Sequence, residues 1–263
     1  MHNTSNGTAT FAKKAKEDRY QYHDYYGVDE LLSEEHLLAR EAVRAWVKSE
    51  VSPIIEEYAD KAECPKHLFK GLAEIGAFGP SLPAEYGCGG MDEIAYGIIM
   101  QELERGDSGV RSMASVQGSL VMYPIYKYGS EEQRRHYLPK LASGEYIGCF
   151  GLTEPDHGSN PAGMLTNIKD DGDAYILNGA KMWITNSPVA DIAVVWARDE
   201  QGVIRGLIVE KDMPGFSAPE IHGKWSLRAS ITGELIFEDV RVPKKNVLPN
   251  VQGMKGPLGC LSK

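Results

Sequence analysis

The chain has 263 residues, of which 42% are hydrophobic and 25% are charged, and its formal net charge at pH 7 is −9. This composition is that of an ordinary soluble globular protein, and the length allows one large domain or two ordinary ones. The negative charge argues against a nucleic-acid partner, because phosphate binding needs clustered Lys and Arg. No apolar run approaches the roughly 20 residues of a membrane span, so none is expected.

The cysteines and the N-terminus limit the cellular setting. Four cysteines are scattered along the chain without a CxxC pair, which favours reduced, buried thiols over a disulfide framework or a zinc site. We therefore expect no metal. The N-terminus lacks the basic start and apolar stretch of a secretory signal. A basic patch lies at residues 13–19, but acidic residues follow at once, which makes a mitochondrial transit peptide the weaker interpretation.

The first half of the chain has helical periodicity. Apolar residues recur at helical spacing over residues 31–57, and charged residues fall on the opposite face. Residues 83–90 are too rich in Gly and Pro for regular structure and are predicted to form a loop. Further helices are expected over residues 68–75, 93–105, 113–128 and 131–142.

The second half changes to strand patterns, with the boundary near residues 144–148. Residues 174–179 predict a strand that runs into a turn at Asn178-Gly179, and a second strand follows at 181–185. Other strands are expected at 191–198, 204–210 and 233–242, where Val, Ile and Leu are dense. The predicted fold class is α+β, an all-helical domain followed by an antiparallel β-sheet or small barrel.

One predicted loop, residues 150–159, concentrates groups that could bind a ligand. Gly lets the main chain approach closely, and Thr and Ser donate hydrogen bonds, so the loop could hold an anion or a flat heterocycle. On the residues alone, an ordinary connector stays open as the alternative. The segment lacks the GxGxxG pattern of a Rossmann site, and no GxSxG supports a hydrolase.

Two other segments allow either a functional or a purely structural interpretation. Trp183 stands beside Thr185 at a predicted strand end, where a core Trp is the alternative. Glu104 and Arg111 bracket a short loop, and such an Arg could bind a substrate carboxylate through paired hydrogen bonds. A solvated surface pair is the alternative for these two residues.

Taken together and in order, four stretches resemble the acyl-CoA dehydrogenase family. They are residues 83–87, 150–159, 181–186 and 224–243. Within the family the likeness is closest to the glutaryl-CoA dehydrogenases, on residues 102–112, 119–125, 148–155 and 183–188. The resemblance implies an N-terminal helical domain, a middle β domain and a C-terminal four-helix domain, usually in a homotetramer. The division expected here is an arm at 1–30, a helical domain at 31–146, a flavin-binding domain at 147–255 and, at 256–263, a stub of a C-terminal domain that is otherwise absent.

The resemblance also implies a cofactor and a site. The cofactor is FAD, and the residues that match the family's flavin-binding positions are Phe150, Leu152, Thr153, Gly158, Ser159, Trp183, Ile184 and Thr185. The residues that match its substrate-binding positions are Glu104, Arg111, Ser112 and Ser159. Val110 stands where some relatives carry Tyr, which departs from the glutaryl pattern.

The implied reaction is the α,β-dehydrogenation of an acyl-CoA thioester. In the glutaryl enzymes, which serve lysine and tryptophan degradation, glutaryl-CoA is oxidised and decarboxylated to crotonyl-CoA, and an electron-transfer flavoprotein takes the electrons. The general base is expected beyond Lys263, so no catalytic residue is assigned within the chain, which is expected to be inactive alone. The expected location is the cytoplasm of a bacterium or the mitochondrial matrix of a eukaryote.

Two rival functions stay open. One is a non-decarboxylating or short-chain acyl-CoA dehydrogenase, and the other is a catalytically silent flavin- or CoA-binding module that another chain completes.

Overall fold

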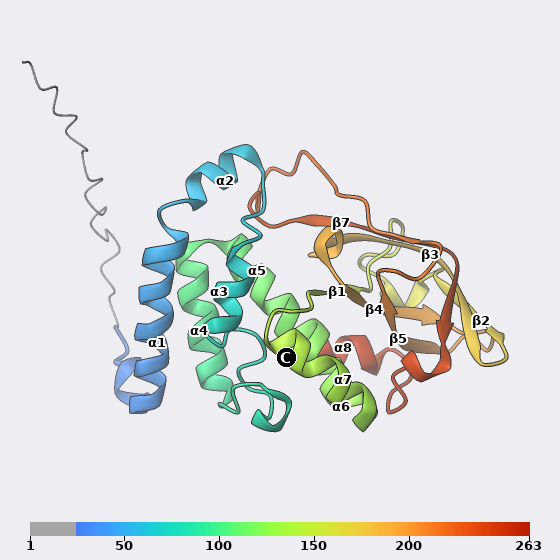
Figure 1. The fold of residues 1–263 in the computed structure, drawn as a ribbon, viewed down its shortest axis with the longest axis horizontal. Helices are drawn as coiled ribbons and strands as arrows, with labels where there is room; N and C mark the ends of the chain where they lie inside the picture. Colours follow the sequence, from blue (N-terminus) through green and yellow to red (C-terminus); the bar gives the residue numbers. More distant parts are fainter. Residues whose placement is uncertain (1–24) are drawn as a thin grey trace, which may run out of the picture. The chain divides into compact units, whose positions relative to one another are not determined.

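The computed structural model describes residues 25–263 (Figure 1). The basic patch at 13–19 and most of the arm expected at 1–30 lie outside the described residues. Residues 34–263 form a compact unit of their own. In the described part of the preceding unit, a short 3₁₀ helix, η1, covers Val28–Leu31. Among the residues described, none of the helices has the length and apolarity needed to cross a bilayer.

The first part of the compact unit is helical, as the periodicity predicts. Its elements are α1 (Glu34–Trp46), the π-helical turn η2 (Val47–Val51), α2 (Ile55–Lys61), α3 (Leu68–Glu74), η3 (Ala84–Tyr86), α4 (Glu93–Gly106), α5 (Ser108–Ser115), the π-helical η4 (Val116–Met122), α6 (Tyr123–Tyr128) and α7 (Glu131–Ala142). The single helix expected over 31–57 is therefore interrupted, because the π turn and Pro53 break the α-helical hydrogen bonding between α1 and α2.

Side-chain caps set the boundary between α4 and α5. Asp107 has an extended backbone that ends α4, and its Oδ1 accepts hydrogen bonds from the backbone N–H of Gly109 (2.7 Å) and Val110 (3.2 Å). This is an N-cap, so α5 begins five residues earlier than the helix expected over 113–128. Arg111 consequently lies on a helix rather than in a loop.

The second part is a seven-stranded sheet. Its strands are β1 (Gly148–Gly151), β2 (Asn167–Asp171), β3 (Ala174–Thr185), β4 (Ile192–Arg198), β5 (Ile204–Glu210), β6 (Phe216–Ser217) and β7 (Thr232–Pro243). The order is β1-β4-β2-β3-β7-β6, with β5 beside β4. Most pairs are antiparallel, but β1 and β2 each pair with β4 in parallel, so the sheet is mixed. The helical part followed by a β part confirms the predicted α+β class, but the sheet predicted to be antiparallel is mixed because β1 and β2 run parallel to β4.

The turn predicted at Asn178-Gly179 is wrong. β3 continues through both residues, and its register with β7 shifts between Leu177 and Gly179. Gly179 has φ of 137°, and a Cβ there would lie 2.7 Å from the Cα of Thr166. The Asn-Gly pair therefore forms a β-bulge against a neighbouring segment and does not reverse the chain.

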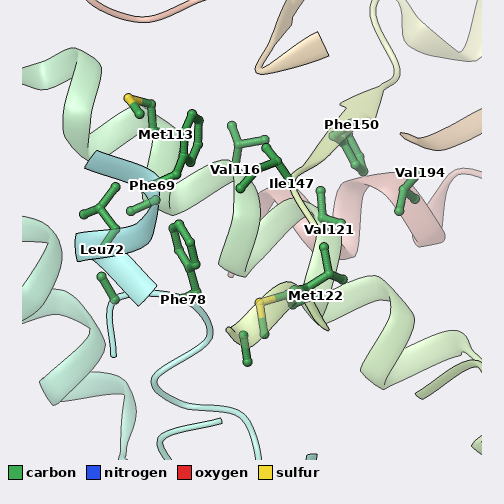
Figure 2. Close-up of a cluster of buried hydrophobic side chains, with 14 of the residues drawn as sticks. Phe69, Leu72, Phe78, Met113, Val116, Val121, Met122, Ile147, Phe150 and Val194 are labelled. Atoms are coloured by element: carbon green, nitrogen blue, oxygen red, sulfur yellow. The ribbon is translucent and has the colours of Figure 1, made fainter. Parts of the chain in front are cut away.

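One hydrophobic core joins the two parts. Figure 2 shows it running from α3 through α5 and η4 to β1 and β4. The residues labelled there are Phe69, Leu72, Phe78, Met113, Val116, Val121, Met122, Ile147, Phe150 and Val194. A second cluster, which includes Leu177, Val209 and Leu235, fills the other side of the sheet. The final helix, α8 (Lys255–Leu261), packs on β4, since a Cβ at Gly256 would lie 2.5 Å from the Trp196 ring. The η4 segment, which continues α5, packs directly on the sheet, since a Cβ at Gly148 of β1 would lie 2.4 Å from the Val121 side chain.

Candidate functional site

The loop that follows β1 contains hydrogen-bond donors that have no acceptor among the residues the structure describes. Thr153 is half-buried, and Gly158 and Ser159 are exposed. Within residues 25–263, the hydroxyls of Thr153 and Ser159 and the backbone N–H groups of Gly158 and Ser159 have no hydrogen-bond partner. A group of open N–H and O–H donors in one loop suits an anion or the edge of a heterocycle.

A buried ion pair holds this loop in place. The Glu154 carboxylate accepts hydrogen bonds from the backbone N–H of Leu165 (2.6 Å) and Thr166 (3.0 Å). The Lys181 Nζ donates to Glu154 Oε1 at 2.8 Å and to the Leu152 carbonyl at 3.2 Å. Burial lowers the pKa of Lys181 to about 8, although its hydrogen bond to Glu154 acts in the opposite direction. Neither residue was predicted as part of the site, because a charge within a predicted strand or loop gives no sign of a partner 27 residues away.

Trp183 lies on an irregular part of β3 and faces solvent. Its φ is 63°, a left-handed conformation that is rare for a large side chain, and its exposed fraction is 56%. The register with β7 shifts between Lys181 and Ile184, and the Met182 N–H donates to the Thr153 carbonyl at 2.9 Å. The exposed ring and the donor loop are therefore neighbours, and together they fit a flat heterocycle that carries polar edges.

The other predicted flavin residues divide between the core and this surface. Phe150 and Leu152 are buried, and Phe150 packs edge-on against Trp196, so their side chains belong to the core. Ile184 is also buried. Thr185 is half-buried, and its hydroxyl has no partner among the residues that the structure describes.

The predicted carboxylate-binding residues form a second cluster on α4 and α5. The Arg111 Nε donates to Glu104 Oε2 at 2.7 Å, and its Nη1 donates to Ser115 Oγ at 3.2 Å. The hydrogen bonds from Arg111 and then from Ser108 lower the pKa of Glu104. In the described part of the chain, Arg111 Nη2 has no partner, and Ser112 is half-buried on the same helix. Ser108 and Ser115 were not predicted as part of the site, although their spacing from Glu104 and Arg111 is the i,i+4 spacing of a helix.

Asn186 connects the two clusters. It is fully buried at the end of β3, and its Nδ2 lies 3.3 Å from the carbonyl oxygen of Met113 in α5 and 3.5 Å from that of Gly148 in β1. Its backbone N–H donates to Ile231 at 2.9 Å. The helix that carries Arg111 is thereby attached to the strand that carries Trp183.

Comparison with known proteins identifies the family. Residues 33–145 match the acyl-CoA dehydrogenase N-terminal domain, and residues 149–240 match the acyl-CoA dehydrogenase middle domain. The chain belongs to the acyl-CoA dehydrogenase family.

Several acyl-CoA dehydrogenases are similar to the chain over most of its length. A glutaryl-CoA dehydrogenase from Mycobacterium smegmatis, solved in complex with FADH2, is 50% identical with a TM-score of 0.88, over 90% of this chain and 61% of that one. The probable acyl-CoA dehydrogenase YngJ of Bacillus subtilis (strain 168) is 39% identical over 82% of this chain and 58% of its own length. The mitochondrial short-chain specific acyl-CoA dehydrogenase of Rattus norvegicus is 34% identical over 92% of this chain and 59% of its own length. The chain thus spans about three fifths of the length of these relatives.

Proposed function

We propose that this chain binds FAD and forms the flavin- and carboxylate-binding parts of an acyl-CoA dehydrogenase that acts on glutaryl-CoA. When bound, FAD supplies the acceptor for the hydride that leaves the β carbon of the acyl chain. Thr153, Gly158 and Ser159 donate hydrogen bonds to the cofactor. Trp183 covers its ring, and Thr185 offers a hydroxyl beside it. The likeness to an FADH2-bound relative at 50% identity supports this assignment.

The observation that carries the substrate proposal is the environment of Arg111. Glu104 and Ser115 fix the guanidinium from two sides, while Nη2 lacks a partner within residues 25–263. A guanidinium fixed in this way binds a carboxylate with defined geometry, so Arg111 and Ser112 receive the distal carboxylate of a glutaryl chain. A monocarboxylic acyl chain would gain nothing from this contact.

Glu104 supports the proposal that dehydrogenation of glutaryl-CoA is followed by decarboxylation. Its carboxylate lies 2.7 Å from the guanidinium that we assign to the substrate, so two carboxylates would share one cation. Loss of carbon dioxide from the oxidised intermediate relieves that repulsion, and addition of a proton from water to the carbanion left at the γ carbon yields crotonyl-CoA. The proposal includes an electron-transfer flavoprotein as electron acceptor and a homo-oligomeric whole protein. It assigns no proton-abstracting carboxylate among the 263 residues.

A second candidate is a short-chain or non-decarboxylating acyl-CoA dehydrogenase. The Glu104–Arg111 pair favours it to a degree, because the pair neutralises Arg111 before any substrate arrives. The short-chain specific relative at 34% identity is consistent with it.

Two binding titrations distinguish glutaryl-CoA recognition from the short-chain alternative, and the products of the whole protein, crotonyl-CoA or glutaconyl-CoA, distinguish the decarboxylating from the non-decarboxylating enzyme. The 263-residue chain is first titrated with FAD, followed by the change in flavin fluorescence. The FAD-loaded chain is then titrated with glutaryl-CoA and with butyryl-CoA, which differ by the distal carboxylate. We expect FAD binding and tighter binding of glutaryl-CoA. Equal affinities, or tighter binding of butyryl-CoA, would support the short-chain alternative, and a chain that binds no FAD would overturn the proposal.

A further inference from the structure

Glu154 and Lys181 form a buried ion pair directly behind the proposed flavin surface. Their Oε1 and Nζ atoms are 2.8 Å apart, and the exposed fractions of the two side chains are 4% and 0%. Removing two charges from water costs free energy that their attraction seldom returns in full, and apolar side chains of similar volume often stabilise a fold as well. The directed hydrogen bonds of the pair, rather than its net energy, therefore set it apart from an apolar contact.

These hydrogen bonds fix both ends of the loop at residues 152–166. The Lys181 Nζ donates to the carbonyl of Leu152, the first residue of the loop. The Glu154 carboxylate accepts from the N–H groups of Leu165 and Thr166, its last two residues. One ammonium and one carboxylate thus close the loop that presents the open donors of Thr153, Gly158 and Ser159.

The same pair adjoins the irregular part of β3 that exposes Trp183. Lys181 is the last residue paired with β7 before the register shifts. The next residue, Met182, donates its N–H to the Thr153 carbonyl at 2.9 Å, and Trp183 then takes its left-handed conformation. A large side chain keeps such a conformation only where its surroundings determine it. The donor loop and the aromatic ring are therefore both attached to one anchor.

We propose that Glu154 and Lys181 are positioning residues that hold loop 152–166 and Trp183 in the flavin-binding arrangement before the cofactor arrives. The pair does not touch the cofactor, and it acts through the groups at Thr153 and Trp183. This inference rests on the proposed binding of FAD by the chain.

The test separates a positioning role from a merely structural one. The variants are Lys181→Met, Glu154→Gln and the double variant that combines them. Lys181→Met leaves a buried carboxylate without its cation and lowers the Tm of the FAD-free chain, whereas the double variant removes both charges and recovers much of that Tm. A structural pair predicts that FAD affinity recovers with the Tm. A positioning pair predicts that FAD affinity stays low in the double variant.

The expected loss of FAD affinity in the double variant is about tenfold or more. Gln has a single carbonyl oxygen for the two N–H groups at Leu165 and Thr166, and Met has no donor for the Leu152 carbonyl, so at least two directed hydrogen bonds disappear. A fluorescence titration gives the Kd for FAD. Amide hydrogen exchange of the FAD-free chain gives a second readout, in which Leu165 and Thr166 exchange faster than in the wild type.

An ion pair with a buried carboxylate and a half-buried guanidinium, far from the loop in sequence, provides the control. Glu102 of α4 is 3% exposed and accepts a hydrogen bond from Arg44 Nη2 at 2.8 Å, but it lies among helices. Glu102→Gln should lower the Tm while the Kd for FAD stays within about twofold of the wild type. If the double variant does not fold, the isosteric Glu154→Gln variant is tested by the same two readouts.

The possible failures are distinguishable. If the wild type binds FAD and the folded double variant binds it equally tightly, or if the exchange of Leu165 and Thr166 is unchanged, the positioning role is overturned and the proposed function stands. If the wild type binds no FAD, both are overturned.

Discussion

Replacing Gly179 by Ala tests the bulge that joins β3 to the flavin loop. At φ of 137°, a residue with a Cβ is strained by roughly 1–3 kcal/mol. The added Cβ would also lie 2.6–2.8 Å from Thr166 atoms, the Cα among them, and overpacking of this kind costs a further 1–3 kcal/mol or so. We expect the free energy of unfolding to fall by about 4 kcal/mol, which corresponds to a Tm lower by roughly 8–16 °C in a unit of this size.

Gly172 provides the control for Gly179. It also has positive φ, 73°, but a Cβ there would have no atom within 4 Å. Gly172→Ala should therefore cost only about 1–2 kcal/mol, the usual penalty for a left-handed backbone. Urea unfolding and thermal denaturation of the FAD-free chain measure both variants. If Gly179→Ala destabilises the chain no more than Gly172→Ala does, the close packing of the bulge on Thr166 is refuted.

Three further predictions concern the site. Arg111→Lys removes the fork-shaped donor, so the Kd for glutaryl-CoA should rise about tenfold or more in a flavin absorbance titration, while the Kd for butyryl-CoA stays unchanged. Trp183→Gly should be more stable to urea than Trp183→Ala by roughly 0.5–1 kcal/mol, because Gly tolerates φ of 63°; equal stabilities would contradict that conformation. Since burial lowers the pKa of Lys181 to about 8, FAD affinity should weaken between pH 7 and 9 in the wild type and not in the Lys181→Met/Glu154→Gln variant. Because the pKa of Lys181 is lowered by folding, the folded chain loses this proton at a lower pH than the unfolded chain does. The free energy of unfolding should therefore rise between pH 8 and 10, opposite to the expected change in FAD affinity. A wild-type Kd for FAD that is flat over this range would contradict the role of the Lys181 charge.

Local sequence patterns predicted the helices and most strands, because a helix or strand that buries one face repeats apolar residues at the period of that face. The apolar spacing in residues 93–105 and 131–142 matches α4 and α7, and the strand compositions at 204–210 and 233–242 match β5 and β7. The prediction of a turn at Asn178-Gly179 was wrong because it, too, relied on local sequence alone. The local signal for a turn is genuine, but packing against Thr166, which lies in another segment, determines the conformation there.

The features that could not be predicted from the sequence depend on contacts between residues far apart in the chain. β1 is four residues long and pairs in parallel with β4, more than forty residues later, so no local alternation reveals it. Sequence motifs named Thr153 and Trp183 as candidates, but they could not show that Glu154 and Lys181 support both. Charged residues are usually solvated, and only the fold brings this carboxylate and ammonium together away from water.

The buried amide of Asn186 has a consequence for folding cooperativity. Because it links α5 with β1 and β3, and because the core in Figure 2 is continuous across the same elements, the helices cannot open without exposing apolar surface of the sheet. Residues 34–263 should therefore behave as one foldon, with a single unfolding transition for helical and β signals. A ligand that binds at the sheet then slows amide exchange in α5 as well, by the same free energy with which it stabilises the strands.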